Sequence, residues 1–271
     1  MRRGREHSAR NRRCGPRLLR VQIGLVGSGN MARALALGWG EPVLCTDSGS
    51  GRAQELAALV GGQAVAANRE LAERADLVVL AHKPAQLDTV ARQIAGAAKV
   101  VVSILARTTQ AEVRAAYPET PVFRIEPNTP VEVRRGVLAF AVPDAPVDEQ
   151  VQTRVRELFG RLGTVVDVPE PLMRIAGATG GVGPAYWALL VEAQVDAAIR
   201  RGMPPQLAST LVVETMAGSA ELLRAREHDT LGLRRAVASP GGTTARGLAA
   251  LERAGVRAAL AQAMDDVVDF A

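Results

Sequence analysis

The chain has 271 residues, of which 48% are hydrophobic and 23% charged, enough apolar side chains for a large buried core. This composition excludes disorder of the whole chain, and no apolar run approaches the roughly 20 residues of a membrane-spanning helix. With only two cysteines, Cys14 and Cys45, a disulfide framework and a four-cysteine metal site are excluded. Aromatic residues make up 3% of the chain, too few for stacking platforms that bind single-stranded nucleic acid.

The net charge of +5 is concentrated at the amino terminus. Residues 1–20 contain eight arginines and one acid, Glu6, which gives this segment +7 and leaves −2 for residues 21–271. We interpret 1–20 as a basic, disordered leader; a basic arm for nucleic acid or anionic lipid and a targeting peptide are the alternatives. The near-neutral remainder lacks the basic surface of a nucleic-acid-binding domain. We therefore expect a cytoplasmic protein with neither nucleic acid nor membrane as a partner.

From residue 21 to residue 168, short apolar runs alternate with helix-forming stretches. Strands are expected at 21–26, 42–46, 77–81, 99–103, 121–125, 136–142 and 164–168. Helices are expected at 31–38, 52–60, 85–97 and 147–162. Apolar runs without strict alternation are typical of strands covered on both faces. The alternation therefore predicts βαβ units and a mostly parallel sheet in an α/β domain over residues 21–168.

The pattern changes after Pro169, and no further strand is expected. Helices are expected at 185–201, 205–224, 244–254 and 258–270. Ala, Leu and Val occupy more than one face of these helices, and a helix that is apolar all round must be buried. A helical domain of about 100 residues has limited room inside, so we expect a second chain to bury the remaining surface. We place an all-α dimerisation domain at 169–271.

A glycine-rich loop, Gly27-x-Gly29-x-x-Ala32, lies between the first expected strand and the first expected helix. The first glycine permits a tight turn, the second lets the backbone approach a pyrophosphate, and the small third residue packs the helix on the strand. The free N–H groups and the positive end of the helix dipole favour phosphate. This context predicts a Rossmann-like dinucleotide site; a tight turn without a ligand is the alternative.

The choice between NADH and NADPH stays open. Asp47, at the end of the second expected strand, suits both ribose hydroxyls and therefore NADH. Thr46, Ser48, Ser50 and Arg52 suit a 2′-phosphate and therefore NADPH. A helix-capping or turn role is the alternative for Asp47.

A second glycine-rich loop, SPGGTT at 239–244, precedes a helix in the carboxyl-terminal half. Ser, Thr and Gly are good N-cap residues, and adjacent glycines expose backbone N–H groups. The loop is suited to a carboxylate or a phosphate, and an ordinary helix cap is the alternative.

Five motifs occur in an order that makes the chain recognisable: GSGNMA at 27–32, Lys83-Pro84, PNTP at 127–130, GPAY at 183–186 and SPGGTT at 239–244. Together they resemble the pyrroline-5-carboxylate reductase family over about residues 21–265. The resemblance implies a Rossmann-like domain followed by a helical domain that dimerises, as a homodimer or a ring of dimers. It also implies reduction of the cyclic imine 1-pyrroline-5-carboxylate to L-proline with NADPH or NADH.

The resemblance also implies site residues. Those that bind the cofactor are Gly27, Ser28, Gly29, Asn30, Met31, Ala32, Thr46, Asp47, Asn68, Ala81, His82, Lys83, Pro84 and Ala106. Those that bind the substrate are Glu170, Gly242, Thr243 and Thr244, the last with its hydroxyl near the ring nitrogen as the catalytic candidate.

Such chemistry depends mostly on positioning, because a protonated imine is already electrophilic. A proton reaches the nitrogen from Thr244, from a water molecule or from solvent. The three histidines, His7, His82 and His228, are scattered along the chain, and no metal site is expected.

Several positions depart from the pattern of the family. Gly180 and Val182 replace two serines, Glu126 replaces a methionine, Arg107 a glycine, and Arg174 and Arg235 each an acid. Loss of the serines removes hydroxyl groups near the expected substrate pocket. Two alternatives to the expected activity follow: a reductase of a different cyclic imine, and a dimeric nucleotide-binding protein without catalysis.

Overall fold

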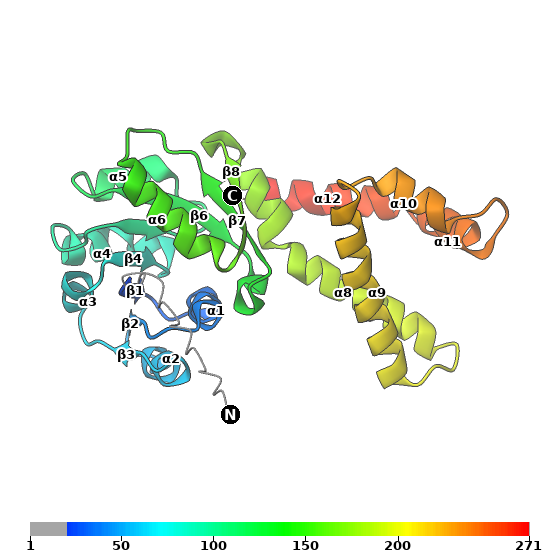
Figure 1. Cartoon of the computed structure of the whole chain (residues 1–271), viewed down its shortest axis with the longest axis horizontal. Helices are drawn as coiled ribbons and strands as arrows, with labels where there is room; N and C mark the ends of the chain where they lie inside the picture. Colours follow the sequence, from blue (N-terminus) through cyan, green and yellow to red (C-terminus); the bar gives the residue numbers. More distant parts are fainter. Residues whose placement is uncertain (1–20, 271) are drawn as a thin grey trace, which may run out of the picture.

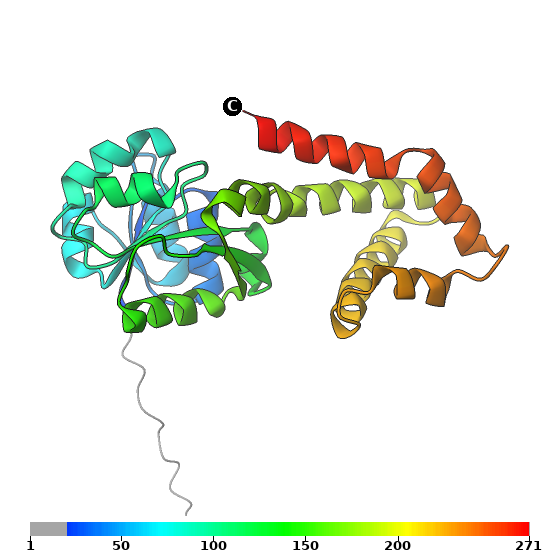
Figure 2. The same cartoon turned by 90° about the horizontal axis from the view of Figure 1, so that it is seen from above.

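The computed structural model describes residues 21–270, so the leader expected at 1–20 lies outside the described residues. An eight-stranded sheet with helices on both faces is followed by helices that extend away from it as an arm (Figures 1 and 2). This architecture confirms the predicted α/β Rossmann-like region followed by an all-α region.

The sheet has the strand order β3-β2-β1-β4-β5-β6-β7-β8. Its strands are β1 (Ile23–Val26), β2 (Leu44–Thr46), β3 (Gln63–Ala64), β4 (Leu77–Leu80), β5 (Val101–Ser103), β6 (Val122–Pro127), β7 (Gly136–Ala141) and β8 (Gly163–Val168). The pairs from β3 to β6 are parallel, whereas β6 and β7 are antiparallel. The carboxyl ends of β2, β1, β4, β5 and β6 therefore follow one another along one edge, where ligands bind in such sheets.

Helices cover both faces of the sheet. They are α1 (Asn30–Trp39), α2 (Arg52–Val60), α3 (Asn68–Arg74), α4 (Leu87–Ile94), α5 (Gln110–Ala116) and α6 (Glu149–Gly160), with 3-10 turns η1 (Pro84–Gln86) and η2 (Thr129–Val133). One apolar cluster, with Trp39 and Phe159 edge to face, joins α1, α2 and α6 to the sheet. A second cluster, with Leu71, Ile94 and Tyr117, joins α3, α4 and α5 to it. Burial on both faces explains the apolar runs of β1 and β4.

Several short elements are not predicted by the sequence patterns, namely α3, α5, α10 and β3. The prediction of one helix over 85–97 was wrong in extent, because η1 occupies its start and α4 ends at Ile94. Gly96 has a φ of 76°, a left-handed conformation that does not continue an α-helix. The strand and helix positions elsewhere in the sheet region agree with the prediction to within a few residues.

The arm consists of helices, and no strand follows β8 within the described residues. Its elements are η3 (Glu170–Leu172), α7 (Met173–Ala176), the π-helical η4 (Gly177–Gly181), α8 (Gly183–Ile199), α9 (Pro205–Ala225), α10 (Thr230–Val237), α11 (Thr243–Arg253) and α12 (Val256–Asp269). Both views show α12 running back from the tip of the arm toward the sheet (Figures 1 and 2).

The arm has almost no core of its own. No described residue of α10, α11 or α12 is buried, and in α9 only Ala208 and Val212 are. Trp187 and Leu189 on α8 are 56% and 63% exposed. Such an apolar surface requires a covering partner, in agreement with the expected homo-oligomer.

Between residues 21 and 270, the structure contains no helix that is both long and apolar enough to cross a membrane.

Gly38 on α1 offers a test of how closely this sheet region is packed. A Cβ atom there would overlap the carbonyl oxygen of Val131 and the Leu162 side chain, whereas one at Gly160 on α6 would meet nothing within 4 Å. Gly38→Ala should lower the free energy of unfolding by about 1–3 kcal/mol, the usual cost of overpacking. Urea unfolding at fixed protein concentration measures this loss. Gly160→Ala is the control, and equal stability of the two variants would contradict the packing described here.

Candidate active site

The first glycine-rich loop opens a cleft of about 590 Å³ at the carboxyl edge of the sheet. Gly27 has a φ of 103°, and a Cβ atom there would lie 2.6 Å from the Ala81 carbonyl oxygen. Gly29 is the N-cap of α1, and a Cβ atom on it would meet nothing within 4 Å. The loop therefore combines a turn that requires glycine with open space before a helix N-terminus, which suits a pyrophosphate.

Polar side chains at the ends of β1 and β2 fix the shape of the cleft. Ser28 donates from Oγ to the Thr46 carbonyl oxygen at 2.9 Å. Thr46 donates from Oγ1 to Asn68 Oδ1 at 2.5 Å, and Asn68 donates from Nδ2 to Gln93 Oε1 at 2.7 Å. These residues line the cleft, as do Asn30 and Met31. Thus the predicted phosphate-side and adenosine-side residues come together, except that Ala32 is buried in the core.

The carboxylate of Asp47 is occupied by its own loop. Its Oδ1 accepts from the Gly49 N–H at 2.8 Å, and its Oδ2 accepts from Ser50 Oγ at 2.9 Å and from the Ala53 N–H at 3.0 Å. The Ala53 bond in particular holds the pKa of Asp47 below its ordinary value. This geometry is that of a turn and helix-start acid, while Arg52 lines the cleft without such a constraint.

The end of β4 forms the other side of the cleft, with Ala81, His82 and Lys83 among its lining residues. His82 places Nδ1 2.9 Å from the Lys83 carbonyl oxygen, while its Nε2 is buried without a partner among the described residues. Burial lowers the pKa of His82, so its neutral form is favoured. Pro84 begins η1, and Ala106 follows the neighbouring strand β5 beyond the lining of the cleft.

The second glycine-rich loop lies in the arm. Gly241 has a φ of 70°, Gly242 is the N-cap of α11, and Thr243 and Thr244 are its first residues. The Gly242 N–H donates to the Ser239 carbonyl oxygen at 3.0 Å. Figures 1 and 2 place α11 at the end of the arm away from the sheet. Within one chain, the structure does not bring this loop to the cofactor cleft.

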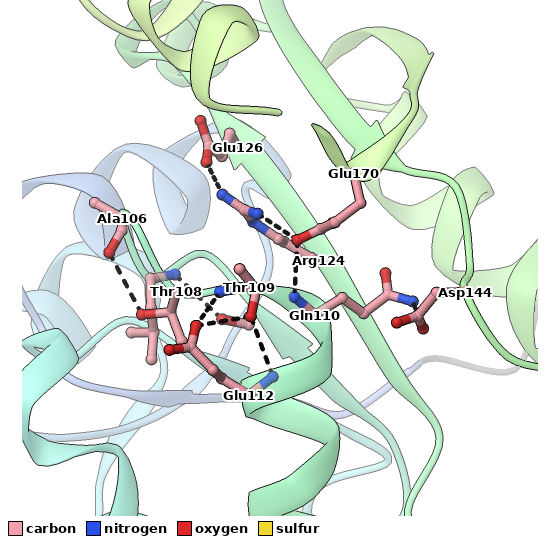
Figure 3. A network of polar contacts seen from close by, with 11 residues as sticks. Ala106, Thr108, Thr109, Gln110, Glu112, Arg124, Glu126, Asp144 and Glu170 are labelled. Atoms are coloured by element: carbon pink, nitrogen blue, oxygen red, sulfur yellow. Dashed lines mark hydrogen bonds and ion pairs between the residues drawn. The ribbon is translucent and has the colours of Figure 1, made fainter. Parts of the chain in front are cut away.

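Glu170 lies in a buried charge cluster with Arg124 and Glu126 (Figure 3). Its Oε1 accepts from Arg124 Nη1 at 2.6 Å and from the Gln110 N–H at 3.0 Å. Arg124 also pairs through Nη2 with Oε1 of Glu126, two residues further along β6. The side chains of Arg124, Glu126 and Glu170 are 5%, 16% and 23% exposed. One cation thus serves two carboxylates in a region of low solvent access.

Sequence reasoning did not identify Arg124. A local signal exists, since this arginine interrupts the apolar strand β6 and an acid follows two positions later on the same face. Its second partner, Glu170, lies 46 residues away in the chain, and that pairing depends on the topology.

Two of the positions that depart from the family pattern lie at the end of α12. Arg174 on α7 donates from Nη2 to the Phe270 carbonyl oxygen at 2.9 Å. The Arg107 guanidinium lies over the Phe270 ring, 5.4 Å from its centroid, and Arg107 has a φ of 61°. The cation–π contact and the hydrogen bond hold the end of the arm beside the loop that carries Ala106.

A mostly parallel sheet with a glycine-rich loop at its carboxyl edge is typical of dinucleotide-dependent oxidoreductases. The family described as "NADP oxidoreductase coenzyme F420-dependent" matches residues 22–107, and "Pyrroline-5-carboxylate reductase dimerisation" matches residues 170–271. The pyrroline-5-carboxylate reductase of Synechocystis sp. is 33% identical, covering 90% of this chain and 94% of that protein. Pyrroline-5-carboxylate reductase 3 of Mus musculus is 31% identical, covering 90% and 92%. The chain belongs to the pyrroline-5-carboxylate reductase family.

Solved structures agree with this assignment. Pyrroline carboxylate reductase from Plasmodium falciparum with NADP bound has a TM-score of 0.82 and 26% identity, covering 92% of this chain and 96% of that one. The 1-pyrroline-5-carboxylate reductase of Streptococcus pyogenes has a TM-score of 0.83 and 29% identity, covering 92% and 97%. The predicted family, an oxidoreductase with a nicotinamide cofactor, is thereby confirmed.

The buried cluster predicts that two arginine substitutions lower the free energy of unfolding by different amounts. Arg124→Met leaves Glu126 and Glu170 without their cation, which should lower the free energy of unfolding by about 3 kcal/mol. Arg33→Met, the control, removes an exposed pair with Glu132 and should cost under about 1 kcal/mol.

Urea unfolding of both variants at one protein concentration measures the difference. Replacing both glutamates by glutamine in the Arg124→Met background should recover part of the loss. Equal, small losses for the two arginine variants would show that the cluster is not a buried ionic unit.

Proposed function

We propose that the chain reduces 1-pyrroline-5-carboxylate to L-proline with a reduced nicotinamide dinucleotide, as an NADPH-preferring enzyme of the cytoplasm. The observation that carries the proposal is the cleft at the sheet edge, where Gly27 provides the turn and Gly29 leaves space before the α1 N-terminus. The relatives named as pyrroline-5-carboxylate reductases support the substrate.

The residues of the cleft fit the cofactor. The backbone from Gly27 to Ala32 suits the pyrophosphate, and Thr46, Asp47 and Asn68 lie where the adenosine side would be. Ala81, His82, Lys83 and Pro84, with Ala106 in the loop after β5, would face the nicotinamide side. When bound, the reduced nicotinamide supplies a hydride. The chain orients the two reactants and excludes water, which is mainly a positioning effect.

The substrate side of the proposed site comes from a second copy of the chain. Gly242, Thr243 and Thr244 offer backbone N–H groups and hydroxyls for the substrate carboxylate and ring nitrogen, but they lie at the tip of the arm. The exposed apolar faces of α8 and α9 support pairing of two arms.

Glu170 binds Arg124 and Gln110 in the cluster, so we assign it a supporting role next to the site.

The direct test follows NADPH and NADH absorbance with purified protein and 1-pyrroline-5-carboxylate. We expect turnover with both cofactors and a lower KM for NADPH, because Arg52 lines the adenosine side while the Asp47 carboxylate is engaged by Ser50 and Ala53 of its own loop. A six-membered cyclic imine serves as the comparison substrate. Cofactor binding without turnover of either imine would leave only the nucleotide-binding alternative.

Arg52→Ala should raise the KM for NADPH about tenfold and change the KM for NADH little, because only NADPH carries the 2′-phosphate. Initial rates with each cofactor measure the two constants. Arg69→Ala is the matched control, since Arg69 is exposed on α3 and pairs with Glu73 outside the cleft. Equal changes for both cofactors would remove Arg52 from phosphate recognition.

Hybrid dimers test whether two chains build one site. Gly29→Glu places a carboxylate in the phosphate space of one chain, and Thr244→Glu places one in the substrate loop of the other. Each variant alone should be inactive. A hybrid purified through two different tags should regain about half of the wild-type activity, because one of its two sites combines intact elements.

If each chain formed its own site, the hybrid would remain as inactive as the two parents. Light scattering of the hybrid and of both parents confirms that the chains are paired in every sample. Fluorescence titration with NADPH should show normal binding for Thr244→Glu and loss of binding for Gly29→Glu.

A further inference from the structure

We propose that Glu126 is a specificity-determining carboxylate that stabilises the protonated imine nitrogen of the substrate. The inference rests on the proposed function, and it concerns the form of the substrate that the site selects. Nothing in the loops assigned to the cofactor or to the substrate carboxylate provides a negative charge for this nitrogen. The Arg124–Glu126–Glu170 cluster provides one.

The position of Glu126 follows from the order of the strands. The cleft runs along the carboxyl edge from Thr46 at the end of β2, through Gly27 after β1, to His82 after β4. Ala106 follows β5, the next strand on the same edge, and Glu126 lies near the end of β6, the strand after that. In the register of these parallel strands, Ser103 is opposite Arg124. Glu126 therefore occupies the next place along this edge beyond the residues assigned to the nicotinamide side.

The wall beside Glu126 is formed by the π-helical segment Gly177–Gly181. A Cβ atom at Gly177 would overlap Oε2 of Glu126, so the carboxylate lies directly against this backbone. Asn128, also on the edge of β6, donates from Nδ2 to the Gly180 carbonyl oxygen at 3.0 Å and accepts from the Val137 N–H at 2.8 Å. Short π-helical segments occur often at functional sites. Here Glu126 at the end of β6 lies against the segment, and Asn128, the residue after β6, is hydrogen-bonded to it.

The cluster has an excess of negative charge. Arg124 is the one cation bonded to Glu126 and Glu170, and its Nε, like Glu170 Oε2, is buried without a partner among residues 21–270. The π-helical segment GATGG and Ala139, opposite Glu126 on β7, contribute no titratable group. Glu112, at the start of α5, adds a further carboxylate on the far side of Arg124. A cationic ligand next to Glu126 would balance this excess charge.

The pKa of Glu126 supports the same interpretation. Burial raises it, Arg124 opposes that rise, and the nearby Glu170 adds to it. The charged form of such a buried carboxylate is disfavoured. An additional positive neighbour therefore stabilises it more than it would stabilise a fully solvated carboxylate. The neutral imine offers no such charge, whereas the protonated imine does.

The chemical step is then simple. A hydride, with its electron pair, forms a new C–H bond at the imine carbon, and the π pair of the C=N bond moves onto nitrogen. The nitrogen keeps the proton with which it was bound, so the products are the secondary amine and the oxidised nicotinamide. Glu126 neither gives nor accepts a proton; it raises the fraction of bound substrate that is already protonated.

Equilibrium binding tests the role of Glu126 without turnover. The probes are L-proline, whose ring nitrogen is an ammonium, and tetrahydrofuran-2-carboxylate, which has a ring oxygen there and the same carboxylate. Calorimetric titration of the full chain with oxidised NADP present gives Kd for both. Glu126→Gln should weaken L-proline binding about tenfold, the equivalent of one pKa unit, and leave tetrahydrofuran-2-carboxylate binding unchanged or tighter.

Glu132→Gln is the matched control, because it also removes one negative charge, from an exposed side chain on η2. It should leave the ratio of the two Kd values as in the wild type. Glu126→Met serves as a second variant if the glutamine variant fails to fold. A ratio unchanged in a folded Glu126 variant would overturn the inference, whereas absence of wild-type turnover would instead overturn the proposed function.

Discussion

The arm cannot bury its own apolar surface, and the rest of the molecule depends on that constraint. Helices α10, α11 and α12 contain no buried residue, and α8 exposes large side chains such as Trp187. Helices in water gain most of their stability from tertiary packing of an apolar face. A second chain must therefore cover this surface. The sheet region buries an apolar cluster on each of its faces within a single chain.

This division separates the two halves of the proposed chemistry. The cofactor cleft is built by short polar contacts at strand ends, such as those of Ser28, Thr46 and Asn68, within a rigid sheet. The loop at 239–244 belongs to the element that pairs. In the proposed site, pairing brings the loop of one chain to the cleft of the other. The contact of Phe270 with Arg107 ties the end of the arm to the sheet region of the same chain, and the contact with Arg174 ties it to the start of the arm.

Much of the fold could be predicted from the sequence, because buried parallel strands are apolar throughout and the loop at 27–32 has a defined geometry. Short helices such as α3 and α5 were missed, since their sequences are mostly polar or small, and only α5 begins at a side-chain cap, Thr109. The role of Asp47 stayed open because an acid that follows a strand can bind the ribose hydroxyls or the backbone of its own loop equally well. The partners of Arg124 lie up to 46 residues away, so only the topology reveals them.

Burying a charge cluster of this kind lowers the stability of the protein, and its presence in the structure therefore requires a physical reason. Two buried carboxylates around one arginine stabilise a protein less than apolar side chains of similar size would. The cluster joins β6 to the first turn of the arm, the junction where the sheet ends and the helices begin. If rigidity of that junction were its whole role, Arg124 and Glu170 would suffice as a pair. The second carboxylate, on Glu126, adds uncompensated charge at the one edge of the sheet where ligands bind. Recognition of a cation explains an uncompensated carboxylate at this edge better than a contribution to the stability of the fold does.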